Sequence, residues 1–122
     1  MTQLKPPIIV KYTQNATIIT FTGEKILEEK DIANLQQTIM PVIEQSEQMH
    51  FILDFQNVQF LSSAVLGLLL RISKKIYEKN STLRMCSING KIYEIFKITR
   101  LNKIFDIYDD LQSAQQSITA GD

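Results

Sequence analysis

Short apolar runs bounded by polar turns recur along the chain and predict five β-strands. The first two are separated only by residues 13–16, which predicts an antiparallel hairpin. The third is apolar apart from Asp54, as expected for a strand buried on both faces. The predicted strands cover residues 8–12, 17–21, 51–55, 82–88 and 104–108.

Apolar residues spaced three and four positions apart predict helices between these strands. The first helix is predicted over residues 28–44, with Pro41 inside the pattern, where it is expected to kink or shorten the helix. The second, over residues 63–78, has first turns that are apolar nearly all round and must be buried. A short helix over residues 91–99 follows a predicted turn at residues 89–90, and a last one lies near the C-terminus.

The order of these elements is β-β-α-β-α-β-α-β-α. Such alternation implies largely parallel strands joined by right-handed crossover connections. A chain of 122 residues is long enough for one domain with its own core. We therefore predict a single α/β domain over residues 1–122, with a mostly parallel sheet and an N-terminal antiparallel hairpin.

The charge balance bears on the kind of partner. Lys+Arg and Asp+Glu number 13 each, so the formal net charge is zero, which argues against nucleic-acid binding as the main function. The longest apolar run, residues 64–70, is far short of the roughly 20 residues that cross a bilayer, so no membrane insertion is expected. The basic residues that come closest to forming a nucleic-acid-binding patch are Lys91, Lys97, Arg100 and Lys103. They alternate with apolar residues, which is the ordinary pattern of a helix with one solvated face.

The N-terminal residues and the cysteine content favour a cytoplasmic location. The first residues lack the apolar core and cleavage site of a signal peptide. The single cysteine, Cys86, forms no internal disulfide, and its strand-like neighbours predict a buried packing role.

No pattern typical of an enzyme or a metal site is present. The single histidine, His50, precedes a predicted buried strand and is interpreted as a strand-edge residue. A Gly-x-Ser-x-Gly turn, a phosphate-binding Gly-rich loop and a cluster of metal-ligating residues are all missing from the sequence. We therefore expect no catalytic activity, no metal and no cofactor.

The candidate functional segment spans residues 51–67, where a strand leads through a polar turn to Ser62 and Ser63 at the start of the second helix. A helix N-terminus favours negative charge because its first N–H groups are unpaired and its peptide dipoles are aligned. A phosphate on either serine would therefore be electrostatically favourable. The simpler interpretation is that one of these serines only caps the helix.

Three segments resemble the STAS domains, in particular the bacterial anti-sigma-factor antagonists. Residues 60–67, Phe-Leu-Ser-Ser-Ala-Val-Leu-Gly, are similar to the family's Phe-Met-Asp-Ser-Ser-Gly-Leu-Gly segment. Residues 22–24 resemble its Gly-Glu turn, and residues 98–105 its Thr-Gly-Leu-x-x-Ile/Phe-Phe segment. The family's phosphorylated serine falls on Ser63. The family's preceding Asp is Ser62 here, which makes Ser62 an alternative acceptor.

The resemblance implies a partner switch that regulates transcription. The unphosphorylated domain, able to act as a monomer, would bind an anti-sigma factor with serine-kinase activity, and the sigma factor would be released. Phosphorylation of Ser63 would oppose this binding, and a serine phosphatase would restore it. The partner-binding residues are expected to be Glu24, Ser62, Ser63, Ala64, Val65, Leu66 and Gly67, with residues 64–66 forming a small flat apolar patch.

Several of these residues have a second interpretation. Gly67 permits close approach either by a partner or by a strand of the same domain. Asp54 is predicted to orient the turn through backbone N–H groups, with direct partner contact as the alternative. Asn57 is assigned to the same turn, and Gly23 ends the second strand. Glu24 is either a partner contact or a solvated turn residue.

The main alternative function keeps the fold but removes the switch. In that interpretation the chain is a constitutive STAS interaction subunit of a signalling scaffold or of a transport complex, without phosphorylation. The replacement of the family Asp by Ser62 favours this alternative.

Overall fold

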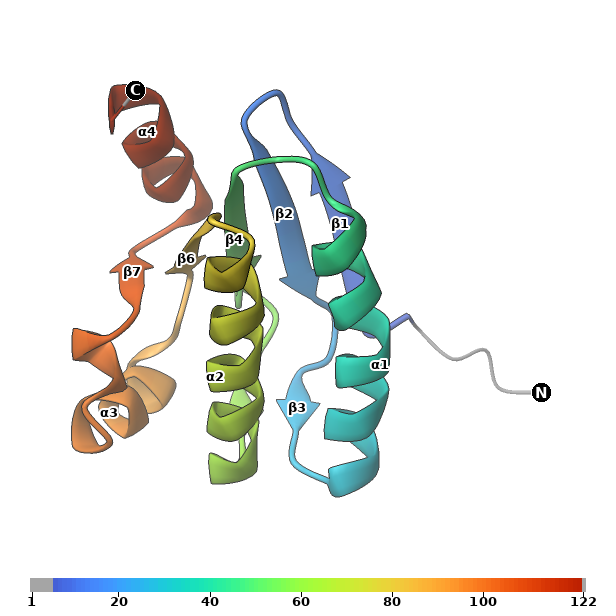
Figure 1. Cartoon of the computed structure of the whole chain (residues 1–122). Helices are drawn as coiled ribbons and strands as arrows, with labels where there is room; N and C mark the ends of the chain where they lie inside the picture. The colour runs from blue at the N-terminus through green and yellow to red at the C-terminus, as the bar shows by residue number, and fades with distance from the viewer. Residues whose placement is uncertain (1–5, 122) are drawn as a thin grey trace.

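The computed structural model describes residues 6–121, which form a five-stranded β-sheet with helices on both faces (Figure 1). The strands are β1 (Ile8–Tyr12), β2 (Ala16–Phe21), β4 (His50–Asp54), β6 (Thr82–Cys86) and β7 (Asp106–Tyr108), and they lie in this order across the sheet. β1 is antiparallel to β2, and the other neighbouring pairs are parallel. The predicted α/β class, mostly parallel sheet and N-terminal hairpin are confirmed.

The helices divide between the two faces of the sheet. Within the described residues they are α1 (Glu29–Gln45), α2 (Ser63–Glu78), α3 (Gly90–Ile98), the 3-10 helix η1 (Leu101–Lys103) and α4 (Leu111–Gly121). Successive side chains of a strand point to opposite faces. Ile19 and Phe21 of β2 pack in the larger hydrophobic cluster with residues of α1, α2 and α3, whereas Ile18 packs with Ala114 of α4. α4 therefore covers the face opposite to the other three α-helices.

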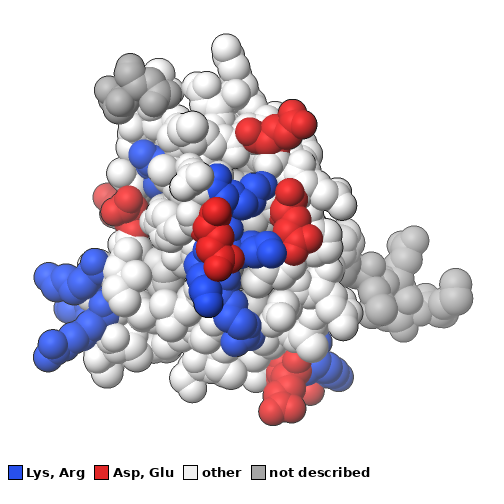
Figure 2. All heavy atoms as spheres, viewed as in Figure 1, with Lys and Arg blue, Asp and Glu red and all other residues white. Residues whose placement is uncertain are grey.

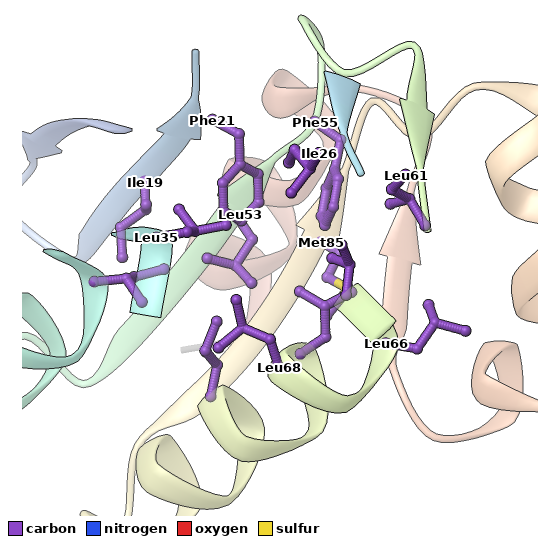
Figure 3. Packing of buried hydrophobic residues seen from close by; sticks show 14 of the residues in the cluster. Ile19, Phe21, Ile26, Leu35, Leu53, Phe55, Leu61, Leu66, Leu68 and Met85 are labelled. Atoms are coloured by element: carbon purple, nitrogen blue, oxygen red, sulfur yellow. The ribbon is translucent and has the colours of Figure 1, made fainter. Parts of the chain in front are cut away.

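A second, smaller sheet was not predicted from the sequence. It consists of β3 (Lys25–Ile26) and β5 (Phe60–Leu61), paired in parallel with Lys25 opposite Phe60 and Ile26 opposite Leu61. Strands of two residues are too short to show a hydrophobic period, so only the folded chain reveals them. Figure 3 shows Ile26 and Leu61 on these neighbouring strands, next to Phe55.

Pro41 does not shorten α1. The helix continues to Gln45, although a proline inside a helix removes one backbone hydrogen bond. Pro41 lies on the exposed side, and the opposite side buries Ile32, Leu35, Ile39 and Ile43. Burial of this apolar stripe stabilises the helix by several times the roughly 3 kcal/mol that an interior proline costs.

Three predicted boundaries differ in the structure: the end of β6, the start of α3 and the start of β7. Ser87 has φ 63°, which ends β6 at Cys86 rather than at residue 88. Asn89 is the N-cap of α3 rather than part of a free turn, since its side chain accepts a 2.9 Å hydrogen bond from the backbone N–H of Ile92. η1 likewise occupies residues 101–103, so the last strand begins at Asp106 rather than at residue 104.

Candidate functional site

The serine pair lies at the end of the domain where the parallel strands terminate. β2, β4 and β6 are parallel, so their carboxyl ends share one edge of the sheet. From β4 the chain runs through β5 and enters α2 at this edge, as Figure 1 shows. In open α/β sheets the carboxyl edge is where binding sites form.

The two serines have different surroundings. Ser62 is the N-cap residue, with extended φ −88° and ψ 162°, but its side chain makes no capping hydrogen bond. Its Oγ atom is buried and has no hydrogen-bond partner within residues 6–121. Ser63 is the first residue of α2, and it is exposed. The accessible hydroxyl at this helix start therefore belongs to Ser63, and the predicted capping by a serine side chain is absent at Ser62.

The predicted flat apolar patch beside the serines does not form. Val65 and Leu66 are only 1% and 6% exposed and belong to the larger hydrophobic cluster, in which Figure 3 shows Leu66. Only Ala64 of the three is exposed. The reason is the all-round apolar character of the first turns of α2, which the fold uses to cover the sheet.

Gly67 does not mark a helix–strand contact. A Cβ atom added there would meet Nη1 of Arg71 at 3.6 Å, an ordinary van der Waals distance, and no strand approaches it. Arg71 in turn donates a 3.0 Å hydrogen bond from Nη2 to Oε1 of Gln36 on α1. Gly67 therefore leaves room beside the α1–α2 link rather than against the sheet.

The turn between β4 and β5 is held by two polar side chains. Asp54 is 1% exposed, and its Oδ1 accepts a 3.0 Å hydrogen bond from the backbone N–H of Gln56, as its predicted turn role requires. Asn57 donates from Nδ2 to the carbonyl oxygen of Phe21 at 3.1 Å, so it ties the turn to the end of β2 rather than stabilising the turn internally.

The segment between β2 and β3 contacts the same turn through its backbone. The carbonyl oxygen of Glu24 accepts hydrogen bonds from the N–H groups of Gln59 (2.8 Å) and Phe60 (3.1 Å). The Glu24 side chain is exposed. Gly23 has no positive φ, so a residue with a side chain fits its backbone conformation. The backbone of Glu24 thus stabilises the smaller sheet, whereas its side chain remains exposed to solvent.

The first turn of α2 is favourable for an anion. It carries no acidic residue, so its N–H groups and dipole are not neutralised by a carboxylate of the same turn. Over α1 and α2, basic side chains alternate with acidic ones (Figure 2).

Within residues 6–121, no three His, Cys, Asp or Glu side chains gather in a way that suits a metal ion, and no helix has the length and apolar character to span a membrane.

Cys86 lies on β6 next to the start of the turn between β4 and β5. It pairs with Asp54 across the β4–β6 ladder and is fully buried, as predicted. Burial, and then the neighbouring Asp54 carboxylate, raise the pKa of the Cys86 thiol from 9.0 to about 12. The thiol is therefore protonated at neutral pH and chemically inert.

Comparison with known proteins identifies the fold. The family model of the STAS domain matches residues 7–114. The chain belongs to the STAS domain family. A relative from Paenibacillus polymyxa, named anti-sigma F factor antagonist, is 26% identical over 103 residues, covering 84% of this chain and 86% of the relative.

Solved STAS structures share the architecture. An anti-sigma-factor antagonist (STAS) domain protein from Planctomyces limnophilus superposes with a TM-score of 0.83 at 21% identity, over 92% of this chain and 97% of the other. SpoIIAA, the Bacillus cell fate determinant, in its phosphorylated form superposes with a TM-score of 0.66 at 14% identity, over 90% and 98% of the two chains. At these identities the structures show the fold alone.

The meeting of three residues near the serines was not predicted from the sequence. Lys25 and Phe60 become neighbours through the β3–β5 pairing, and Lys91 reaches the same place from the first turn of α3. Nothing in the local sequence signals this meeting, because it depends on two strands of two residues each.

Proposed function

We propose that this STAS domain is an anti-sigma-factor antagonist whose binding to its partner is switched off by phosphorylation of Ser63. The observation that carries the proposal is the exposed Ser63 hydroxyl at the first position of the 16-residue helix α2. The partner is an anti-sigma factor with serine-kinase activity, and a serine phosphatase reverses the modification. The domain acts through binding rather than catalysis.

The buried Oγ of Ser62 supports Ser63 as the acceptor. A kinase transfers phosphate only to an oxygen that it can reach, and the Ser62 hydroxyl oxygen is buried. Its phosphorylation would require the start of α2 to open. Ser63 needs no such opening.

Electrostatics explains why phosphorylation should weaken partner binding rather than strengthen it. A phosphate adds about −1.5 to −2 charges at pH 7. The free domain accommodates this charge at the start of α2, where the first turn contains no acidic residue. In a complex the same dianion loses its hydration and repels acidic groups of the partner. A difference of about 1.4 kcal/mol between the two states already changes affinity tenfold.

The test is affinity capture from native extract with three forms of the full chain. These are the wild type, Ser63→Asp as a mimic of the charge, and Ser63→Asn as a neutral control of the same size. Wild type and Ser63→Asn should retain an anti-sigma factor with a kinase domain. Ser63→Asp should retain at least tenfold less, a loss of about 1.4 kcal/mol or more in binding free energy. Mass spectrometry of the native protein should find phosphate on Ser63 and not on Ser62.

Two results would contradict this function. One is equal capture by all three forms together with an absence of phosphate under every growth condition. The other is capture of a transport or scaffold protein, equally by wild type and Ser63→Asp, which is the outcome expected of a constitutive interaction subunit. Circular dichroism of each variant establishes that the fold is intact.

A further inference from the structure

A groove with an apolar floor and a basic rim lies between the smaller sheet and α3. Its volume is about 350 Å³. Leu61, Ile92 and Ile95 line its apolar part, and Lys25 and Lys91 line its edges. These residues come from three separate segments, β5, α3 and β3, so only the folded chain creates the groove.

Both lysines are placed around one exposed aromatic ring. The Nζ atoms of Lys25 and Lys91 lie 5.8 Å and 5.4 Å from the centroid of Phe60. A ring face attracts ammonium groups at such distances, so Phe60 holds the two charges near one another. Within residues 6–121 neither lysine forms a salt bridge, and no carboxylate lines the groove.

Apolar surface remains uncovered at the same place. Phe60 is 43% exposed, and Leu27, which also lines the groove, is 47% exposed. Covering these side chains with another apolar group removes their surface from water and is favourable by roughly 25 cal/mol per Å². The groove therefore combines exposed apolar surface with two positive charges that form no salt bridge.

We propose that this groove docks an acidic amphipathic segment of the protein partner. An apolar side chain of the segment packs on Phe60, Leu61 and Ile95, while its carboxylates pair with Lys25 and Lys91. The identity of the partner as an anti-sigma factor rests on the proposed function, whereas the chemistry of the segment rests on the groove.

Position relative to Ser63 favours a protein segment as the occupant. Leu61 lines the groove, and Ser63 follows two residues later, so their Cα atoms are separated by at most about 7 Å. A phosphate on Ser63 would therefore place negative charge near the Leu61 side of the groove, where an acidic segment would be bound. Repulsion between the phosphate and the carboxylates of the segment would lower the affinity for the partner. A second copy docked symmetrically would instead bring four lysines together.

The probe is a capped octapeptide in which glutamate alternates with leucine, titrated into the full-length labelled protein and followed by amide NMR shifts. Two peptides of the same length serve as controls, one with lysine for glutamate and one with serine for leucine. The acidic amphipathic peptide should shift the amides of Lys25, Phe60, Lys91 and Ile95, and both controls should shift them far less.

A matched pair of charge-reversal variants tests the groove itself. Lys25→Glu combined with Lys91→Glu should weaken the peptide at least tenfold, because repulsion replaces two attractions. Lys74→Glu combined with Lys103→Glu makes the same change in net charge at exposed lysines outside the groove and should have less than a twofold effect. Dispersed amide spectra establish that each variant is folded.

Four results would overturn the proposal. They are the absence of shifts at millimolar peptide, equal weakening by both double variants, shifts that map away from the groove, and concentration-dependent shifts at the groove without peptide, which would mean that a second copy covers it. The titration involves neither a kinase nor a phosphate. The switch at Ser63 can therefore fail while the groove binds, and the groove can fail while the switch holds.

Discussion

Ser62 and Ser63 are adjacent in the chain, yet one side chain points into the protein and the other into solvent. The first position of a helix and its N-cap differ in backbone conformation, here extended at Ser62 and helical at Ser63. That difference turns the two side chains in different directions. A pair that looks equivalent in the sequence is thereby divided into one exposed side chain and one buried hydroxyl.

The buried hydroxyl leads to a stability prediction. Serine caps that are replaced by alanine usually lower helix stability by about 1 kcal/mol. Ser62→Ala should instead raise the free energy of unfolding by roughly 0.5–1 kcal/mol, because it removes a buried polar atom that has no partner. Urea denaturation measures the change.

Asn89→Ala is the control at a cap that does form. It removes the 2.9 Å hydrogen bond that the Asn89 side chain accepts from the N–H of Ile92, and the 3.2 Å bonds that it donates to the carbonyl oxygens of Val58 and Gln59. It should lower the free energy of unfolding by about 1 kcal/mol or more. A similar loss in Ser62→Ala would mean that Ser62 caps α2 in solution.

The Cys86 thiol predicts how stability depends on alkaline pH. Its pKa rises from 9.0 to about 12 on folding, so between these values the unfolded chain has released a proton that the folded chain retains. Deprotonation then favours the unfolded state. Stability should be unaffected by this group below about pH 9 and should fall as the pH rises toward 12, with a slope approaching about 1.4 kcal/mol per pH unit.

Cys86→Ala isolates this contribution. Lysines and tyrosines titrate in the same range, but the wild type and the variant share them. The difference in free energy of unfolding between the two proteins should shrink between about pH 8 and about pH 10.5, measured by urea denaturation under reducing conditions. A difference that is independent of pH would contradict the raised pKa.

Among the elements, α1 is completed by a residue from another helix. Its last turn has no basic residue of its own. Lys79, the C-cap residue of α2, donates from Nζ to the carbonyl oxygens of Ile43 and, at 2.7 Å, of Ser46. A cation at the carboxyl end of a helix is favourable because it meets unpaired carbonyl groups and the negative end of the dipole. The end of α1 therefore depends on the packing of α2 beside it.

The end of α3 carries local strain. Arg100 has φ 64°, the left-handed conformation that glycine adopts most readily and that helices often use just after their last turn. It stands where the family segment Thr-Gly-Leu has glycine. A side chain in this conformation costs roughly 1–2 kcal/mol.

Arg100→Gly should therefore stabilise the protein. Part of the relief is offset by the greater freedom of glycine in the unfolded chain, so the expected gain is about 0.5–1 kcal/mol in the free energy of unfolding. Thermal and urea denaturation both measure it. Arg100→Ala keeps the Cβ atom and should give no comparable gain, whereas an equal gain in Arg100→Ala would assign the effect to the loss of charge.

At the scale of the whole molecule, stability and partner binding are expected to respond oppositely to negative charge at Ser63. Ser63→Asp places a carboxylate at the first position of α2, where no other acidic residue is present in the first turn. Its interaction with the helix dipole should raise the free energy of unfolding by about 0.3–1 kcal/mol relative to Ser63→Asn. The same change should weaken partner binding.

Thermal denaturation at low salt, alongside the binding measurement, tests this opposition. The stabilising effect should decline as salt screens the exposed charge. A variant that is destabilised as well as defective in binding would show that loss of fold, rather than a switch, explains the defect.

Much of the fold was accessible from the sequence because each long element has a periodic pattern of its own. The strands of the main sheet, α1 and α2 were all predicted, since burial of one face leaves a regular spacing of apolar residues. Boundaries were wrong where a single residue adopts a left-handed conformation, as at Ser87, or where a cap extends a helix, as at Asn89. Such features depend on one φ angle or one hydrogen bond.

By itself the sequence determined the α/β class, the parallel arrangement and the placement of two serines at a helix start, because these follow from local periodicity and order. Only the tertiary structure decided which serine is accessible, that Val65 and Leu66 are buried, and that Lys25, Phe60 and Lys91 meet. These properties depend on contacts between segments far apart in the chain. Pairing of two-residue strands and the direction of a single side chain leave no period in the sequence.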